Sequence, residues 1–375
     1  MKKLVAAIGT LALLTAPLQT GFAAESEQNS EDYLVKFDGP AEQGLLEAFG
    51  VEDEDVLHAY ELLPVYHINL SENQANGLEN HPQVEFVEEN AEAEALSQTE
   101  PWGVPHVQGT EAQDAGHTGE GVSVAVLDTG VDRSHEDLNV AGGYSVFDDA
   151  ENSDPYYDAN GHGTHVAGTV AALDNDLGVI GVAPETEVYA VKVLDNDGGG
   201  SYAGIAEGVE WAIQNDIDII NMSLGGSQSS DILEDYTDLA YEEGSLVVAA
   251  AGNDGNRGGN NETVGYPANY ESAMAVAAVD ENNERATFSS TGDAVEIAAP
   301  GVDVLSTVPG NGYDSLNGTS MAAPHVAGVA AQVWQAKPDL TNEELRSLLN
   351  DTAVDLGPAH QYGHGLVQSL NAIQE

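Results

Sequence analysis

The sequence predicts an α/β protein in which helices cover both faces of a mostly parallel sheet, preceded by a small α+β module. Two observations lead to this prediction. Continuous apolar runs recur along the second part of the chain, and segments with helical spacing lie between them. Strands that are apolar on both faces are typical of a parallel sheet buried between helices. The expected strands are 122–127, 188–194, 217–224 and 246–251, and the expected helices include 203–215 and 233–243.

The first part of the chain has a different pattern, which predicts a separate module of the ferredoxin-like kind. Residues 84–89 alternate apolar and acidic side chains, as a strand with one face in water does. The expected strands are 32–37, 67–70 and 84–89, and the expected helices are 41–49 and 71–78. Residues 90–100 are rich in acidic and small side chains, and we expect them to link the two parts.

The N-terminus has the pattern of a secretory signal peptide. Lys2 and Lys3 precede an apolar stretch, and the small residues Gly21 and Ala23 suit cleavage after Ala23. The apolar stretch is short for a membrane span. We therefore expect residues 1–23 to direct secretion, and we expect no membrane partner.

The balance of charge excludes one class of partner and suggests a working medium. The 375 residues include 64 acidic residues and 9 Lys or Arg, which gives a formal charge of −55. Nucleic acids need clustered cations, so they are not expected partners. After position 96 there are 45 acidic and 6 basic residues, so that part alone carries −39. Strong salt screens such repulsion, with a Debye length of about 3 Å at 1 M. We expect a halophilic or halotolerant source.

Three short segments hold the residue types of nucleophilic catalysis. Asp128 lies in Val-Leu-Asp-Thr-Gly, His162 lies in Asn-Gly-His-Gly-Thr-His, and Ser320 lies in Asn-Gly-Thr-Ser-Met-Ala-Ala-Pro. A serine hydroxyl is a poor nucleophile until a histidine takes its proton. The histidine in turn needs a carboxylate to fix its tautomer and stabilise its cation.

Each segment also has a simpler interpretation. An Asp at a strand end can bind backbone amides, and a Gly-Thr-Ser run can be a plain helix N-cap. His165 can be a core residue or, together with His162, a zinc ligand, although the His-Glu-x-x-His spacing is absent. A non-catalytic acidic calcium-binding exoprotein is a second hypothesis for the chain. An esterase is a third, but Ala322 stands where the Gly-x-Ser-x-Gly elbow has its second glycine.

Taken together, the three segments resemble the subtilisin family, and its secreted bacillus-type members most closely, from Ser97 to the C-terminus. The resemblance implies a monomeric serine endopeptidase that cleaves proteins and peptides with broad specificity. It implies that Asp128 orients the imidazole, His162 acts as general base and then acid, and Ser320 forms the acyl-enzyme. It also implies that Asn253, in Ala-Ala-Gly-Asn, donates to the developing oxyanion.

The resemblance further implies a substrate cleft. Ser223, Leu224, Gly225 and Gly226 are similar to the family's edge strand, which pairs with an extended peptide backbone. Gly265 matches the floor of the primary pocket, which implies room for a large apolar group before the cleaved bond. The neighbouring Tyr266-Pro267 bond matches a position that is cis in the family.

Calcium is the cofactor that the resemblance implies. The chain has no Cys, so disulfides are excluded and bound metal is one candidate for stabilisation. The implied ligands are the side chains of Gln98, Asp137 and Asn175 and the carbonyls of Leu173, Leu177 and Val179. Six oxygens suit this hard cation. A second, weaker site is implied at the carbonyls of Ala268, Tyr270 and Ala273.

Residues 24–96 resemble the family's propeptide, which assists folding and inhibits the enzyme. Leu96 suits an apolar primary pocket, so the resemblance implies self-cleavage between Leu96 and Ser97. Residues 97–375 would then be the peptidase domain. The alternative is an ordinary acidic linker at this point in the chain.

Overall fold

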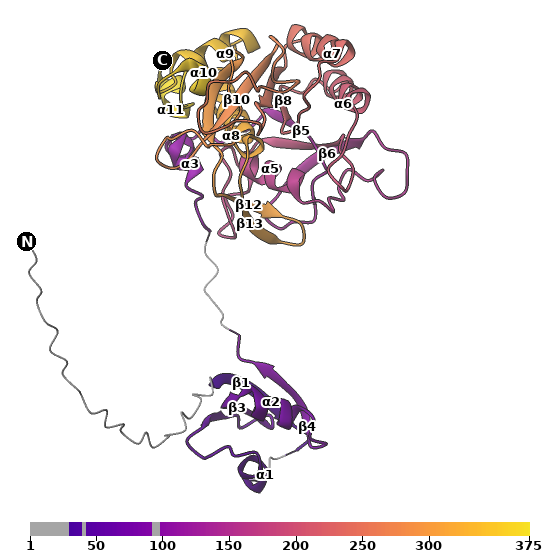
Figure 1. Cartoon of the computed structure of the whole chain (residues 1–375), viewed down its shortest axis with the longest axis vertical. Coiled ribbons are helices and arrows are strands. Elements are labelled where there is room, and N and C mark those ends of the chain that lie inside the picture. The colour runs from indigo at the N-terminus through magenta and orange to yellow at the C-terminus, as the bar shows by residue number, and fades with distance from the viewer. Residues whose placement is uncertain (1–29, 40–42, 92–97) are drawn as a thin grey trace, which may run out of the picture. The chain divides into compact units, whose positions relative to one another are not determined.

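The computed structural model describes residues 30–39, 43–91 and 98–375. The chain divides into two compact units, 1–95 and 96–375, which are described separately (Figure 1). The expected signal peptide and the expected cleavage site at Leu96 and Ser97 lie outside the described residues. No helix among the described residues is both long and apolar enough to cross a membrane.

The first unit is a four-stranded antiparallel sheet with two helices. Its strand order is β2-β3-β1-β4, and its β-α-β-β-α-β succession is that of the ferredoxin-like module. Its core includes Val35, Ile68 and Leu70. The short strand β2 was not expected from the sequence, because most of its side chains are exposed and no apolar run marks it. The elements are β1 (Ser30–Phe37), α1 (Gln43–Ala48), β2 (Val56–Ala59), β3 (Val65–Ser71), α2 (Glu72–Glu79) and β4 (Val84–Glu89).

The second unit is built on a seven-stranded sheet in which every neighbouring pair is parallel. The strand order is β11-β10-β9-β8-β5-β7-β6. The chain crosses from β7 to β8 on the other side of β5, so a topological switch point lies beside β5. Sites form at the carboxyl ends of strands at such points. The strands are β5 (Ser123–Asp128), β6 (Val140–Ser145), β7 (Glu187–Lys192), β8 (Ile219–Met222), β9 (Leu246–Ala250), β10 (Ala273–Val279) and β11 (Val295–Pro300).

Helices cover both faces of this sheet, as the sequence predicts (Figure 1). One face packs against α5 (His162–Ala171) and α8 (Thr319–Ala336), and the other against α6 (Tyr202–Gln214) and α7 (Asp231–Glu242). The remaining elements are α3 (Gly103–His106), α4 (Gly109–Asp114), β12 (Val304–Val308), β13 (Gly312–Leu316), α9 (Asn342–Asp351), α10 (Ala359–Tyr362) and α11 (Ser369–Gln374).

Strand β5 shows why its run of apolar residues is continuous. Val124 and Val126 enter the core on the α5/α8 side, whereas Ala125 and Leu127 enter the core on the α6/α7 side. Successive side chains of a strand point to opposite faces. A strand buried on both faces therefore needs an apolar residue at every position until it reaches the site.

Candidate active site

Asp128 and His162 form a hydrogen-bonded pair at the carboxyl end of β5. Asp128 is fully buried, and its Oδ1 lies 2.8 Å from His162 Nδ1. The same oxygen accepts the Thr129 N–H at 2.7 Å. Burial alone lowers the pKa of His162, but the adjacent Asp128 carboxylate more than offsets this, so the pKa lies above its ordinary value. The imidazole is thereby held as a base with a fixed orientation.

The first turn of α5 is held by a buried carboxylate that the sequence analysis missed. Asp158 Oδ1 accepts the Gly161 N–H at 2.9 Å and the Thr129 hydroxyl at 2.8 Å. Its Oδ2 accepts both the N–H and the hydroxyl of Thr164, at 2.9 and 2.7 Å. Asp158 thus ties the segment after Asp128 to the helix that carries His162. Its position four residues before the helix start was the available signal, because acidic residues favour helix N-termini.

Lys192, at the end of β7, is a second residue that the sequence analysis missed. It is fully buried, and its ammonium group donates to the Thr129 carbonyl and, at 3.2 Å, to Asn196 Oδ1. Burial lowers its pKa, while Asp158 and Asp195 act in the opposite direction. A lone basic residue inside the apolar run 188–194 was the signal in the sequence.

Ser320 lies in the first turn of α8, and two hydrogen bonds join it to Ser223. Ser320 Oγ donates to the Ser223 carbonyl at 3.1 Å, and Ser223 Oγ donates to the Ser320 carbonyl at 2.8 Å. Within residues 98–375 no hydrogen bond joins Ser320 Oγ to His162. Hydrogen bonds of this kind are often long or poorly aligned until substrate binds.

Asn253 follows β9, and α8 fixes the orientation of its side chain. Its Oδ1 accepts the Thr319 N–H at 3.0 Å and the Thr319 hydroxyl at 3.1 Å. Because the amide oxygen is engaged in this way, the amide nitrogen Nδ2 is the end left to donate elsewhere. Asn253 and Ser320 line one cavity of about 410 Å³.

The predicted substrate residues line two cavities around these groups. Leu224, Gly225 and Gly226 contribute to both the cavity that holds Ser320 and a second cavity of about 420 Å³ that holds His162. Gly265 lines the first, and an added Cβ there would lie 3.1 Å from the Gly226 carbonyl. Gly226 exchanges backbone hydrogen bonds of 2.9 and 2.8 Å with Tyr266. Leu224 and Gly225 have no backbone partner among the described residues.

Comparison with known proteins decides the family. The profile of the subtilase family matches residues 119–365. This chain belongs to the subtilase family. The thermostable alkaline protease of Halalkalibacterium halodurans is 49% identical over 371 residues, covering 99% of this chain and 98% of the relative. Alkaline elastase YaB of Bacillus sp. is 46% identical, with 98% of each chain covered. Subtilisin E of Bacillus subtilis is 48% identical over 81% of this chain and 79% of its own.

The subtilase is a serine endopeptidase, as the sequence predicts, and not an esterase or a non-catalytic calcium-binding protein.

His165 is fully buried in this subtilase, and its Nε2 lies 2.9 Å from the Val304 carbonyl. It is therefore a core residue, as one of the alternatives held. Within the described part of the chain, His162 and His165 belong to no group of three or more His, Cys, Asp or Glu side chains that could hold a metal ion. The Tyr266-Pro267 bond is cis, which confirms that expectation.

The predicted calcium ligands gather around the loop after α5. Asp137 is fully buried; its Oδ2 accepts the Val179 N–H at 2.9 Å, and its Oδ1 has no hydrogen-bond partner among the described residues. Gln98 Nε2 donates to the carbonyls of Leu173 and, at 2.9 Å, Val179, so the amide nitrogen faces them rather than the oxygen expected of a ligand. Asn175 Oδ1 accepts the Leu177 N–H at 2.9 Å. A buried carboxylate oxygen without a donor, beside converging carbonyls, fits a hard cation.

The predicted second cation site has a different environment. Ala268, Tyr270 and Ala273 are all buried. The Tyr270 carbonyl accepts the Ala273 N–H at 3.1 Å, and the Ala273 carbonyl accepts the Arg346 guanidinium at 3.2 Å. A metal ion there would compete with a cationic side chain that already occupies one of the three carbonyls.

Proposed function

We propose that Asp128, His162 and Ser320 carry out peptide hydrolysis through an acyl-enzyme. The pairing of His162 Nδ1 with the buried Asp128 carboxylate at 2.8 Å is the observation that carries this proposal. The Ser320 hydroxyl leaves the Ser223 carbonyl, donates to His162 Nε2 and attacks the substrate carbonyl as the ring takes its proton. His162 then gives that proton to the leaving amine, and water repeats the sequence to release the acid.

Two donors next to Ser320 suit the negative charge that develops on the substrate oxygen. Asn253 Nδ2 is one of them, because Thr319 engages the other end of its amide. The Ser320 N–H lies in the first turn of α8, where backbone donors have no partner within the helix. Preorganised donors of this kind stabilise the transition state more than the substrate.

The cavity beside Ser320 supports a broad preference for an apolar side chain before the cleaved bond. Its lining includes Ala250, Gly252 and Gly265, which are small and leave its interior open. The backbone of Leu224 and Gly225, which lacks partners among the described residues, is free to pair with an extended peptide. Such pairing reads main chain and gives little discrimination between side chains.

Residues 24–96 are proposed to be an inhibitory propeptide that the enzyme removes by cleavage between Leu96 and Ser97. Support comes from the first unit, which has a hydrophobic core of its own, and from the division of the chain beside this bond. The direct experiment is intact-mass analysis of the expressed protein. Wild type should begin at Ser97, whereas Ser320→Ala should keep its propeptide; normal processing in that variant would refute both nucleophile and self-cleavage.

Structural Ca²⁺ is proposed at Gln98, Asp137, Leu173, Asn175, Leu177 and Val179. The buried and unpartnered Asp137 Oδ1 is its main support. The ion would balance the negative charge of the buried Asp137 carboxylate. It would also hold the loop after α5 against the segment that begins at Gln98. A second site, which would bind a cation more weakly, is proposed at the carbonyls of Ala268, Tyr270 and Ala273.

We also propose that the enzyme is secreted, that it acts on proteins at alkaline pH and that it is adapted to salt. The signal pattern of residues 1–23 supports secretion, and three relatives are named alkaline proteases or elastase. The charge of −39 after position 96 supports a salty medium. Thermal unfolding from low salt to several molar NaCl tests the last point, and we expect the melting temperature to rise. No rise would rule out adaptation to salt.

A further inference from the structure

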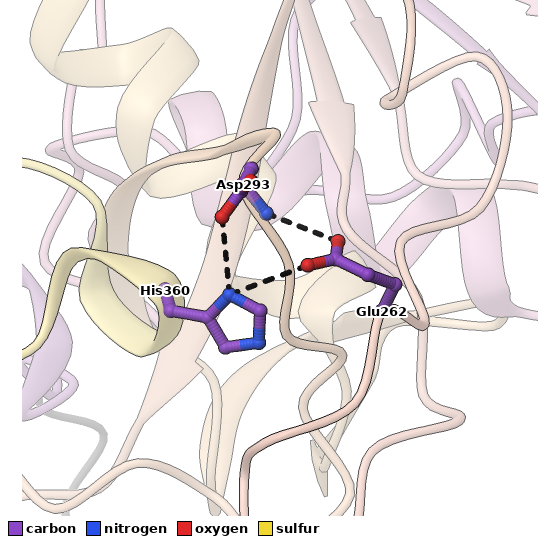
Figure 2. A group of neighbouring side chains, drawn as sticks. All are labelled: Glu262, Asp293 and His360. Atoms are coloured by element: carbon purple, nitrogen blue, oxygen red, sulfur yellow. Dashed lines mark hydrogen bonds and ion pairs between the residues drawn. The ribbon is translucent and has the colours of Figure 1, made fainter.

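Three metal-ligating side chains from separate segments meet on the second unit, away from the residues proposed above. Figure 2 shows the His360 ring facing the carboxylates of Glu262 and Asp293. Glu262 lies three residues before Gly265, Asp293 precedes β11, and His360 belongs to α10. His360 Nδ1 lies 3.5 Å from Glu262 Oε1 and 3.4 Å from Asp293 Oδ1. One ligand atom from each residue falls within 4.8 Å of the other two.

Backbone groups hold these side chains in place. The Asp293 N–H donates to Glu262 Oε2 at 3.1 Å, and the Gly292 N–H donates to the His360 carbonyl at 3.0 Å. The Glu262 carboxylate packs closely on this turn, since a Cβ added at Gly292 would lie 2.4 Å from Glu262 Oε2. This turn therefore bonds both the Glu262 side chain and the backbone of His360, and it carries Asp293 itself.

The distances suit a shared ion better than direct hydrogen bonds. Good N–H···O bonds have donor–acceptor distances of about 2.7–3.2 Å, shorter than the two observed here. Two ligands at about 2.0–2.2 Å from a tetrahedral ion lie roughly 3.4 Å apart. The distances from His360 Nδ1 to the two carboxylate oxygens, 3.5 and 3.4 Å, are close to this separation between two ligands of one ion.

The charge of the cluster is not balanced by a basic side chain. Among the described residues, His360 is the only ion-pair partner of either carboxylate. The nearby Arg285 directs its guanidinium N–H groups to the backbone carbonyls of Asn256, Ala286 and Ser289. Two carboxylates and one imidazole therefore face one another without a Lys or Arg between them.

We propose that Glu262, Asp293 and His360 bind a divalent transition-metal ion of the zinc class. One imidazole and two carboxylates are ligands that Zn²⁺ accepts, whereas Ca²⁺ prefers six to eight oxygens. Glu262 and Asp293 are 66% and 96% exposed, so water can fill the remaining coordination positions. The ion would join α10 to the loop that leads to Gly265. This site does not depend on the proposed peptidase mechanism.

The test is a Zn²⁺ titration of the full chain carrying Ser320→Ala, which prevents proteolysis during the measurement. Excess Ca²⁺ saturates oxygen-only sites, and calorimetry then counts the Zn²⁺ ions bound. We expect His360→Gln on this background to bind one Zn²⁺ fewer, or to bind it at least tenfold more weakly. His364→Gln removes an exposed histidine from the same segment and should leave the titration unchanged.

Glu262→Gln provides a second variant, because it keeps the shape of an exposed side chain if His360→Gln fails to fold. It should also weaken the same binding step by at least tenfold. Equal Zn²⁺ stoichiometry and affinity in the parent chain and in a folded variant would mean that zinc is held elsewhere, and would overturn the proposal.

Discussion

Asn253 Oδ1 accepts the Thr319 N–H at 3.0 Å, and this bond determines which end of the Asn253 amide faces the substrate cavity. The Thr319 hydroxyl adds a contact of 3.1 Å to the same oxygen and accepts the Gly252 N–H at 3.1 Å. Thr319, which precedes the proposed nucleophile Ser320, thus orients the proposed oxyanion donor. The start of α8 positions both groups.

Replacing Asn253 by Ala should lower kcat by about 10²–10³ with little change in KM, because the donor acts on charge that develops only in the transition state. This magnitude is the one established for a subtilisin's own oxyanion-hole asparagine. Steady-state kinetics on a peptide substrate, with the melting temperature as a control for folding, would test it. A loss confined to KM would show that Asn253 only binds substrate.

Thr319→Val should reduce kcat by about tenfold, because it removes the hydroxyl that bonds Asn253 and Gly252 while leaving the backbone N–H. Thr319→Ser is the matched control, since it keeps the hydroxyl and should retain near-normal kcat. Equal kinetics of the two variants would show that the hydroxyl does not orient the amide.

The rate should rise with pH through the pKa of His162, which lies above the ordinary value of 6.5. Below this pKa the ring is protonated and does not act as a base. In Asp128→Asn the charge that raises the pKa is lost while burial remains, so the rising limb of kcat/KM should move to lower pH. The activity itself should fall by about 10⁴. An unmoved limb in this variant would assign the titration to another group.

Stability should fall as the pH drops from 6.5 toward 4, because His165 and His325 are fully buried with pKa values of about 4. Burial favours the neutral ring, so in this window the unfolded chain binds the proton that the folded chain does not. The free energy of unfolding should fall by on the order of 3 kcal/mol per histidine, and the loss should level off below pH 4.

Unfolding of the Ser320→Ala chain across this pH range measures the effect. His325→Gln replaces one titrating ring with a side chain that does not titrate, so its stability should depend less steeply on pH between 6.5 and 4. An unchanged slope would show that His325 is not neutral in the folded protein.

Removing the calcium ion proposed at Asp137 should speed thermal inactivation of the wild type. An ion at one hundred times its Kd stabilises the folded state by about 2.7 kcal/mol. Asp137→Asn should be less stable and insensitive to a chelator, because it removes the charge of the buried ligand. Asp174→Asn, which removes an exposed charge from the same loop, is the matched control and should still respond. Chelator sensitivity that persists in Asp137→Asn would place the ion elsewhere.

Much of the fold was predictable because burial on both faces leaves a plain signal. The apolar runs that end at Asp128 and before Asn253 correspond to β5 and β9. The proposed catalytic residues stood out because glycines and small residues around His162 and Ser320 form motifs that resemble those of the family. Three strands of this sheet, β6, β10 and β11, were not predicted. β6 is only partly buried and β11 includes an acidic residue, whereas β10 is a fully buried apolar run whose signal was present in the sequence.

The supporting residues were harder to find for a physical reason. Asp158 is one acidic residue among 64, and its role comes from partners at Thr129 and Thr164 that only the folded chain brings together. For Ser320, the sequence predicts the role of the residue but not the contact that its hydroxyl makes. Its motif predicts a nucleophile, yet its hydroxyl bonds the Ser223 carbonyl here, a contact that no local pattern encodes.

The most direct test of the proposed mechanism is to locate the residue that a serine-directed fluorophosphonate modifies, by peptide-mapping mass spectrometry of the inactivated enzyme. One adduct per molecule, on Ser320, with neither labelling nor peptide cleavage in Ser320→Ala, is the predicted result. An adduct on another residue, or peptide cleavage retained by Ser320→Ala, would contradict it.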